Sequence, residues 1–141
     1  MKLAIGCDHA AVDFKNKIIA YLTDLGYTCE DFGTYTDESC DYPVYADKVC
    51  NAVTDGGFDK GILICGTGIG MSIAANKHKG IRCVACSEPL SAKLSRMHND
   101  TNVLALGARV IGIETGKDIV SAWLSAEFEG GRHIKRISMF E

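Results

Sequence analysis

An apolar segment that runs directly into three alternating glycines constrains the fold of this chain more than any other feature. Gly61-Ile62-Leu63-Ile64-Cys65 has the composition of a buried strand, and Gly66-Thr67-Gly68-Ile69-Gly70 follows it at once. Glycines allow a tight turn and let successive backbone N–H groups approach a ligand, while the start of a following helix favours negative charge. The segment therefore predicts a strand, an anion-binding loop and a helix, in that order.

The same loop fits nucleotide-binding loops poorly. A Walker loop requires Lys-Ser or Lys-Thr at its end, and neither stands there. A dinucleotide-binding fingerprint would follow the first strand, whereas this loop follows the third, and Met71 stands where the last Gly or Ala should be. A tight turn that binds nothing is the plain alternative. Three alternating glycines after so apolar a strand favour the anion site.

Short apolar segments alternate with segments of helical period along the rest of the chain. We expect strands at residues 3–5, 27–32, 61–65, 81–86 and 103–107, and helices at 12–25, 44–55, 71–79, 88–97 and 114–128. This alternation is typical of a parallel sheet with helices on both faces. The sequence thus predicts a three-layer α/β/α Rossmann-like sandwich with a five-stranded parallel sheet, as a single domain over residues 1–141.

Composition narrows the range of partners and compartments. The net charge of −3 argues against nucleic-acid or membrane-surface binding, since both favour a basic face. No apolar run approaches the roughly 20 residues that span a bilayer, and the N-terminal apolar stretch is too short for a signal peptide. The seven cysteines are odd in number and mostly stand singly in apolar segments, which is typical of reduced core residues. We expect a cytoplasmic protein.

Ligands of such sheets bind beyond the carboxyl ends of the strands, where this chain places several reactive groups. Cys65 ends the third strand, where amide dipoles favour a thiolate that takes a proton from carbon or attacks a carbonyl. Asp8 and His9 follow the first strand, although Asp8 would also serve as a helix cap. Arg109 follows the fifth strand. These groups predict chemistry on an anionic substrate.

Two further polar segments lie late in the chain. His98 stands in a polar cluster before the fifth strand and titrates near neutrality, although a turn needs no such function. Arg132 and Arg136, four residues apart, would form a fork for a phosphate, whereas a solvated tail is the plain alternative.

No metal or cofactor motif accompanies these groups. We expect no His or carboxylate cluster at metal-ligand spacing, and His78 stands between two lysines that would repel a cation. A base, an acid, an enediolate-stabilising loop and phosphate-binding cations remain. Aldose–ketose isomerisation through an enediol needs this set of groups and no cofactor.

Motifs along almost the whole chain resemble the type B ribose-5-phosphate isomerases, within the family that includes the galactose-6-phosphate isomerase subunits. The motifs are Gly6-Cys7-Asp8-His9, Gly33-Thr34, Asp41-Tyr42-Pro43, Ile64 to Gly70, Ser72 to Lys77, Gly80-Ile81-Arg82, Cys86-Ser87-Glu88, His98 to Asn102, Gly107-Ala108-Arg109 and Glu129 to His133. The resemblance implies interconversion of D-ribose 5-phosphate and D-ribulose 5-phosphate in the pentose phosphate pathway. It also implies a homodimer with active sites between subunits, and leaves open a dimer of dimers.

The resemblance further implies roles for single residues. Cys65 would be the base that moves the proton between C2 and C1, supported by Thr67. Some family members use a glutamate instead, but Ala74-Ala75 occupies that neighbourhood here. Asp8 and His98 would open the furanose ring, with His98 giving a proton to the ring oxygen. The remaining substrate contacts would be the enediolate-binding residues Gly66, Thr67, Gly68, Ile69 and Gly70, the hydroxyl-binding Asn99, and the phosphate-binding His9, Arg109, Arg132 and Arg136.

Three other functions compete with this interpretation. The nearest is the same isomerisation of a six-carbon sugar phosphate, such as allose or galactose 6-phosphate, because one extra carbon changes binding by only about 1–3 kcal/mol. A nucleotide-binding module without catalysis would use the glycine loop alone. A thiol redox protein would use Cys83 and Cys86, but residues three apart on a strand point to opposite faces.

Overall fold

The computed structural model describes all residues, 1–141, as alternating strands and helices. The strands are β1 (Lys2–Cys7), β2 (Thr28–Asp31), β3 (Lys60–Cys65), β4 (Cys83–Ala85) and β5 (Val103–Gly107). The helices are α1 (Val12–Asp24), α2 (Tyr42–Thr54), α3 (Ile69–Ala75), α4 (Pro89–Asn99), α5 (Ile113–Ser125) and α6 (Arg132–Ser138). None of these helices has the length and apolar character needed to cross a membrane.

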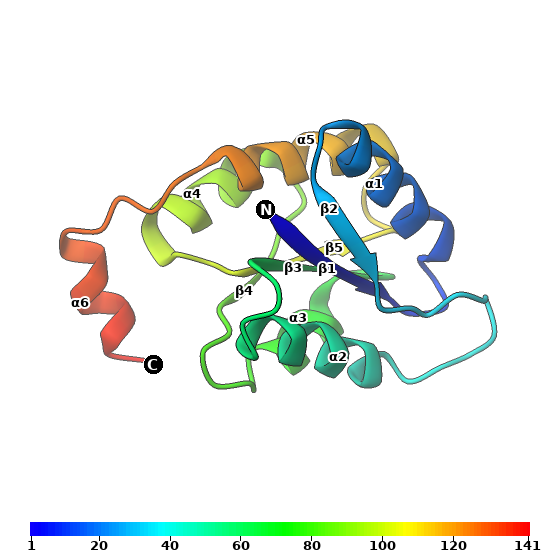
Figure 1. The fold of residues 1–141 in the computed structure, drawn as a ribbon, viewed down its shortest axis with the longest axis horizontal. Helices are drawn as coiled ribbons and strands as arrows, with labels where there is room; N and C mark the ends of the chain where they lie inside the picture. The colour runs from blue at the N-terminus through cyan, green and yellow to red at the C-terminus, as the bar shows by residue number, and fades with distance from the viewer.

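All strands are parallel, in the order β2-β1-β3-β5-β4. Figure 1 shows α1, α4 and α5 on one face of the sheet and α2 and α3 on the other. The chain winds outward from β1 to β2 and then crosses back to β3, so the winding reverses between β1 and β3. In open α/β sheets this point of reversal forms the ligand crevice.

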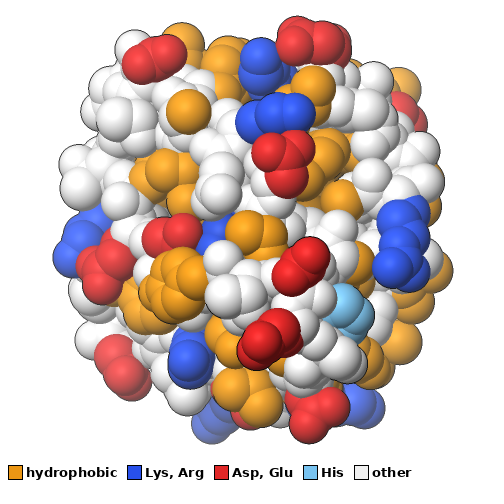
Figure 2. Space-filling model, turned by 90° about the vertical axis from the view of Figure 1, so that its right-hand side faces the viewer, with side chains coloured by type: hydrophobic (Ala, Val, Ile, Leu, Met, Phe, Trp, Pro, Cys, Tyr) orange, Lys and Arg blue, Asp and Glu red, His pale blue; other side chains and the backbone are white.

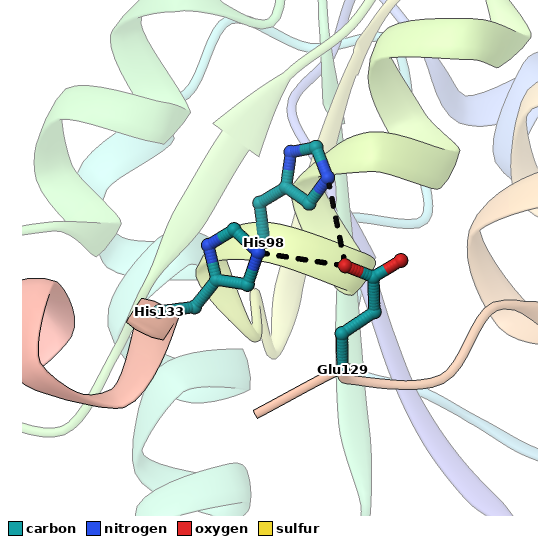
Figure 3. A group of neighbouring side chains, drawn as sticks. All are labelled: His98, Glu129 and His133. Atoms are coloured by element: carbon teal, nitrogen blue, oxygen red, sulfur yellow. Dashed lines mark ion pairs between the residues drawn. The ribbon is translucent and has the colours of Figure 1, made fainter. Parts of the chain in front are cut away.

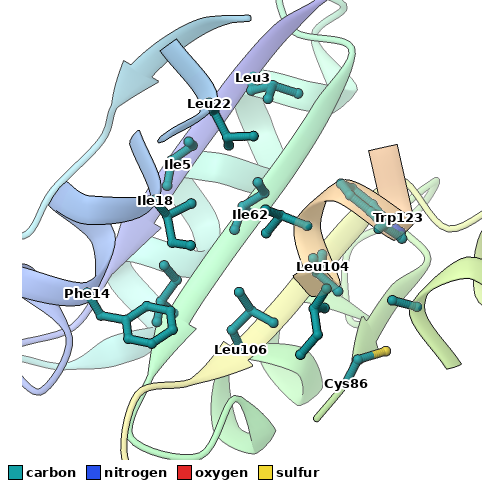
Figure 4. Packing of buried hydrophobic residues seen from close by; sticks show 14 of the residues in the cluster. Leu3, Ile5, Phe14, Ile18, Leu22, Ile62, Cys86, Leu104, Leu106 and Trp123 are labelled. Carbon is teal, nitrogen blue, oxygen red and sulfur yellow. The ribbon is translucent and has the colours of Figure 1, made fainter. Parts of the chain in front are cut away.

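Two apolar cores hold the three layers together, one on each face of the sheet. Side chains alternate between faces along a strand, so Ile62 and Ile64 point to the α1/α5 side while Leu63 and Cys65 point to the α2/α3 side. The first core is the larger, and Figure 4 shows Phe14 of α1 and Trp123 of α5 closing over it. Cys65 therefore ends a strand that is buried on both faces.

The predicted fold is confirmed, although several elements begin or end at other residues than predicted and one helix was not predicted. β4 is shorter than the predicted 81–86 and pairs only with β5, at the edge of the sheet. α3 begins at Ile69 rather than residue 71, because Gly68 takes a left-handed conformation (φ 79°) that caps the helix directly. Residues 132–138 form α6 where no helix was expected, and Figure 1 shows it projecting beside α4.

A buried polar network fixes the C-terminal end of α4. Arg96 donates to the Asp100 carboxylate at 2.7 Å and to the Thr101 carbonyl at 2.6 Å. The indole N–H of Trp123 donates to the Thr101 hydroxyl at 2.9 Å. Buried polar groups must find such partners. Asp100 and Thr101 of the polar cluster are therefore structural, and they hold the preceding His98 and Asn99 at the end of a rigid helix.

Candidate active site

The crevice between β1 and β3 brings Asp8 beside Cys65. Cys7 pairs with Ile64 across the two strands, so the next residues, Asp8 and Cys65, leave the sheet side by side. The Asp8 N–H donates to the Ile64 carbonyl at 3.1 Å, and this is the last backbone hydrogen bond between β1 and β3. The Asp8 side chain does not cap α1; its Oδ1 accepts from the Ala10 N–H at 2.9 Å within the turn.

The Cys65 sulfur is held by the glycine loop. The Gly68 N–H donates to Sγ at 3.1 Å, the contact that a negatively charged sulfur accepts best. Cys65 is 5% exposed, at the boundary between the second core and solvent. Thr67 was expected to support the thiol, but its hydroxyl instead accepts from the Ile69 N–H at 3.2 Å. The sulfur is thus positioned by backbone rather than by a side chain.

Several backbone N–H groups around Cys65 remain available to a ligand. The first N–H groups of a helix have no acceptor within it. Those of Gly68 and Ile69 are used by Cys65 and Thr67, whereas those of Gly70 and Met71 donate to no protein acceptor. A developing oxyanion is stabilised by N–H groups fixed in this way. The loop therefore has the donors that an enediolate oxygen requires.

Close backbone contacts fix the loop in place. A Cβ on Gly107 at the end of β5 would lie 2.6 Å from the Thr67 backbone, and one on Gly70 would lie 2.8 Å from the Tyr42 ring. The Thr67 backbone cannot give way, so Gly107 has to be glycine, whereas the exposed Tyr42 ring would have to turn aside for a side chain in place of Gly70. The loop is pressed between the end of β5 and the start of α2.

The other buried cysteines have no comparable setting. Burial raises the pKa of Cys7 and of Cys86 to about 11, and that of Cys50 to about 12. Burial also raises the pKa of Cys83, which packs against the second core while Cys86 packs in the first. Cys83 and Cys86 thus face opposite sides of the sheet, as predicted, and both are free thiols. The structure does not favour the thiol redox function.

The five arginines divide into two kinds. Arg82 and Arg96 pair with Asp100, at 3.1 and 2.7 Å, and hold the fold together. Arg109, Arg132 and Arg136 are exposed and form no ion pair within the chain. The Arg109 guanidinium lies over Gly66, because a Cβ there would be 3.4 Å from Nη1. Unpaired guanidinium groups are suited to binding an anion.

His9 and a buried lysine lie near the Asp8 side of the crevice. The His9 Nδ1 accepts from the Cys40 N–H at 3.2 Å, which fixes the ring. Lys15, fully buried, pairs with Asp31 at 2.7 Å and donates to the Thr34 carbonyl. No role is predicted for Lys15 from the sequence. Its position on the buried face of α1 was the only available signal, and it anchors the loop that carries Gly33-Thr34.

Four predicted site residues lie far from Cys65, toward the amino ends of the strands or beyond them. His98 and Asn99 end α4, and the neighbouring Asn102 carbonyl accepts from the Gly61 N–H at 2.9 Å, at the amino end of β3. Cys65 lies four residues further, about 13 Å along the strand at 3.3 Å per residue. Arg132 and Arg136 lie on α6, beyond α4. A single chain therefore does not bring His98, Asn99, Arg132 or Arg136 to Cys65.

The cavities of the chain also lie in two separate regions, one near the glycine loop and one near the end of α4. A hollow of about 260 Å³ lies at the carboxyl ends of β4 and β5, with Thr67, Cys86 and Gly107 in its wall. The largest cavity, about 570 Å³, lies between the end of α4 and the segment before β4, with Asn99 in its wall.

One expectation about side-chain clusters was wrong. No group of His and carboxylate residues at metal-ligand spacing was expected, yet His98, Glu129 and His133 present ligand atoms within 4.8 Å of one another. The sequence conceals this cluster because His98 is about thirty residues from the others, and only Glu129 and His133, four apart, gave a local signal. The resemblance had included Glu129 and His133 without giving either a role.

Comparison with known proteins agrees with this geometry. The sequence model of the Ribose/Galactose Isomerase family matches residues 3–140. Ribose-5-phosphate isomerase B of Escherichia coli (strain K12) is 58% identical over 136 residues, which cover 96% of this chain and 91% of that protein. D-erythrulose-4-phosphate isomerase of Pectobacterium atrosepticum is 50% identical over 132 residues, or 93% and 87% of the two chains.

The fold agrees equally well with a solved structure. The structure of Clostridium thermocellum ribose-5-phosphate isomerase B matches with a TM-score of 0.97 and 51% identity, covering 99% of this chain and 94% of that one. A family match over nearly the whole chain, together with the cysteine and glycine loop at the crevice, leads to one assignment. The chain belongs to the ribose/galactose isomerase family and is an isomerase.

Proposed function

We propose that this chain interconverts D-ribose 5-phosphate and D-ribulose 5-phosphate through an enediolate, as a step of the pentose phosphate pathway. The observation that carries the proposal is the Cys65 sulfur, held by the Gly68 N–H at the mouth of the β1/β3 crevice. The 58% identity to the E. coli ribose-5-phosphate isomerase B supports the five-carbon substrate over allose or galactose 6-phosphate. The free thiols fit a cytoplasmic location, where cysteines stay reduced.

Cys65 acts as the base in the proton transfer. Its thiolate takes the proton from C2 of the open-chain aldose, and the electron pair of the broken C–H bond forms the C1–C2 double bond of the enediolate. The oxygen that gains negative charge accepts from the free N–H groups of Gly70 and Met71 and from others in residues 66–70. The thiol then returns the proton to C1, while a hydroxyl proton moves between O2 and O1. No electrons leave the substrate, so no redox cofactor takes part.

Ring opening comes before this step and needs an acid and a base. The furanose ring oxygen must gain a proton as its bond to C1 breaks, and the C1 hydroxyl must lose one. His98 supplies the first proton and Asp8, 8% exposed beside Cys65, accepts the second. Within one subunit, His98 lies toward the amino ends of the strands and Asp8 lies at their carboxyl ends. His98 and Asp8 therefore meet only when they come from different subunits.

A homodimer with two shared active sites follows from this division. One subunit contributes Asp8, Cys65 and the glycine loop, and the partner contributes the ends of α4 and α6. Two features of α6 support this arrangement: its two arginines have no acidic partner, and Ile134, Met139 and Phe140 at this end of the chain are exposed by 58%, 80% and 63%. Exposed apolar groups of this size are typical of protein interfaces.

The phosphate needs cations from both subunits. Figure 2 shows the molecule from the side toward which β1 points, with acidic, basic and apolar side chains interspersed and no broad basic field. Arg109, whose guanidinium lies over Gly66, is the free cation on the Cys65 side, since Lys15 is paired with Asp31. His9, whose Nδ1 accepts from the Cys40 N–H, offers its Nε2–H to the phosphate as a hydrogen-bond donor. Arg132 and Arg136 from the partner would supply the charge for a dianion, and Asn99 would bind sugar hydroxyls.

Mixing two inactive variants tests the shared site. Cys65→Ala and His98→Ala damage different halves, so a mixed dimer has one site with both defects and one site with neither. After dissociation and equimolar reassociation, activity should return to about a quarter of wild type, since half of the dimers are mixed and each has one intact site. Each variant reassociated alone is the control. A mixture that stays inactive would place both residues in one subunit's site and contradict the homodimer proposal.

Relative kcat/KM values for four-, five- and six-carbon aldose phosphates test the substrate. Ribose 5-phosphate should exceed both neighbours. A higher value for a six-carbon phosphate, or for the four-carbon substrate class named in the Pectobacterium relative, would reassign the substrate and leave the enediolate chemistry in place.

A further inference from the structure

Two imidazoles and a carboxylate converge between α4 and α6, as Figure 3 shows. The rings of His98 and His133 stack with centroids 4.6 Å apart and planes at 17°. Glu129 Oε2 lies 3.4 Å from His133 Nε2 and 3.9 Å from His98 Nε2. One carboxylate oxygen is therefore directed toward both rings, and all three groups present an atom that ligates metals.

The distances are close to the spacing around a tetrahedral metal ion. The three ligand atoms lie within 4.8 Å of one another. In a tetrahedral Zn²⁺ site with bonds of about 2.0–2.1 Å, ligand atoms are about 3.3 Å apart. The two carboxylate distances, 3.4 and 3.9 Å, need small shifts to reach this spacing, and the two rings must turn toward a common point, which side-chain rotation supplies. Two histidines and a glutamate are also a donor set that Zn²⁺ uses in enzymes that keep a fourth position open.

The three residues are held from different directions. His98 lies in the last turn of α4, which the Arg96–Asp100 pair and the Trp123–Thr101 hydrogen bond fix. The Glu129 N–H donates to the Met97 carbonyl at 3.0 Å, which ties the loop before α6 to the same turn. His133 is buried in the first turn of α6, whereas the His98 and Glu129 side chains are 38% and 46% exposed. The cluster is assembled in the unliganded chain and open to solvent on one side, and its stacked rings turn out of their stack to bind one ion.

We propose that His98, Glu129 and His133 form a binding site for Zn²⁺ or a similar divalent transition metal, with water in the fourth position. The metal is bound through Nε2 of each histidine and Oε2 of the glutamate. Each nitrogen binds the ion through the lone pair of a neutral imidazole. The ion has no part in the isomerisation.

Occupation of this site inhibits the enzyme. This consequence rests on the proposed function, because His98 Nε2 bound to a metal holds no proton to give to the ring oxygen. Zn²⁺ would act as a reversible inhibitor, and a chelator would restore the full rate. Since proton exchange at C2 of an open-chain substrate uses the Cys65 thiolate and not the His98 proton, it is less affected than ring opening.

Direct binding is measured on the full-length protein at about pH 8, where free imidazole is neutral. Calorimetry with Zn²⁺ should give one site per chain, and Co²⁺ should give the visible absorption of a tetrahedral nitrogen and oxygen site. His133→Ala and Glu129→Gln should each weaken binding at least tenfold, because loss even of outer partners of a ligand typically costs about 10–100-fold. Glu129→Gln keeps the side-chain volume, so it guards against an unfolded α6 in His133→Ala.

His78→Ala is the matched control. His78 Nε2 also lies near a carboxylate, 3.2 Å from Asp47 Oδ1, but has no third ligand. This variant should bind Zn²⁺ as wild type does. Equal loss in His78→Ala and Glu129→Gln would overturn the site. So would a sulfur-to-cobalt charge-transfer band, which would assign the metal to the cysteines.

The rate measurement separates the two proposals. Saturating Zn²⁺ should slow ribose 5-phosphate isomerisation at least tenfold in wild type, and Glu129→Gln should need more than ten times as much metal. Absence of Zn²⁺ binding would overturn the metal site and leave the isomerase assignment untouched. Zn²⁺ that binds at His98 without inhibiting would support the site and contradict the role of His98 in ring opening.

Discussion

The two halves of the proposed active site are built in opposite ways. The residues around Cys65 are part of the core: the strand before them is buried on both faces, and the loop is pressed against the Gly107 and Tyr42 positions. The residues of α6 lie at the periphery, where the helix packs chiefly against α4 and its arginines reach into solvent. The proton-transfer half is packed into the core, and the phosphate-binding half is attached mainly through α4 and through the ion pair between Arg82 and Glu141.

The difference follows from what each half has to do. Proton transfer requires atoms placed within a fraction of an ångström, and backbone amides in a packed core supply such placement without ordering side chains during the reaction. A phosphate is a large, symmetric dianion that long arginine side chains bind from several directions. Changes near Cys65 should therefore alter turnover, and changes in α6 should alter substrate affinity.

Replacing Cys65 should have the largest effect. Cys65→Ala should lower kcat for ribose 5-phosphate by about 10²–10⁴-fold, the usual contribution of a general base, while phosphate binding and the fold persist. Solvent isotope exchange at C2 measures the proton transfer directly. Cys50→Ala is the control, because Cys50 is buried in the same core but distant from the crevice. A loss below tenfold in Cys65→Ala would remove Cys65 as the base.

Gly107 probes the same half through the backbone. Gly107→Ala puts a Cβ within 2.6–2.8 Å of the Thr67 main chain, so the loop or β5 must move. We expect a stability loss of about 1–3 kcal/mol, as for overpacked cores, and a fall in kcat of at least about tenfold. Gly112→Ala is the matched control, since a Cβ there meets nothing within 4 Å and φ is −77°. Wild-type kcat in Gly107→Ala would mean that the loop is not held rigidly.

Local patterns were sufficient to predict this rigid half. The apolar run 61–65 and the glycines after it specify a strand and a tight turn through neighbouring residues alone, and parallel pairing places Asp8 beside Cys65. The hydrogen bond from Gly68 to the sulfur was not predictable, because it depends on the left-handed conformation of a single residue. Residue types predicted where the loop lies, but not which atom holds the thiol.

The peripheral half was harder to predict. Helical period was too weak over seven residues to mark α6, and the convergence of His98 with Glu129 and His133 depends on tertiary packing of α6 beside α4. In the proposed dimer, the position of His98 relative to Cys65 would depend further on a second subunit, about which one chain's pattern carries no geometric information. The resemblance included these residues in its motifs without placing them in space.

Arg136 tests the phosphate-binding half. Arg136→Ala should raise KM for ribose 5-phosphate by about 10–100-fold, since a hydrogen bond to a charged group contributes about 1.5–3 kcal/mol. Turnover of unphosphorylated ribose should hardly change. Lys135→Ala is the control, because Lys135 is an exposed cation one position away on the same helix. Equal damage to both substrates by Arg136→Ala would indicate a structural role for α6 rather than phosphate binding.

The smallest expected effect concerns removal of metals and addition of cofactors. Enediol isomerisation proceeds either with a metal that polarises the carbonyl or with hydrogen bonds alone, and the core half of this site offers free N–H groups around Cys65. The one cluster of metal ligands belongs to the peripheral half and includes the proposed ring-opening acid. A metal there would block the reaction rather than assist it.

The enzyme should therefore run at its full rate after dialysis against EDTA, and NAD, ATP, Mg²⁺ or Mn²⁺ should not raise that rate. The measurement is the initial rate of ribulose 5-phosphate formation before and after dialysis, with metal content checked by emission spectroscopy. A small increase after dialysis is compatible with removal of inhibitory Zn²⁺ from His98, Glu129 and His133. Activity that disappears on dialysis and returns with Zn²⁺ or Mn²⁺ would mean that a metal ion takes part in the isomerisation, and would contradict both the metal-free proton transfer at Cys65 and the inhibitory role of the peripheral site.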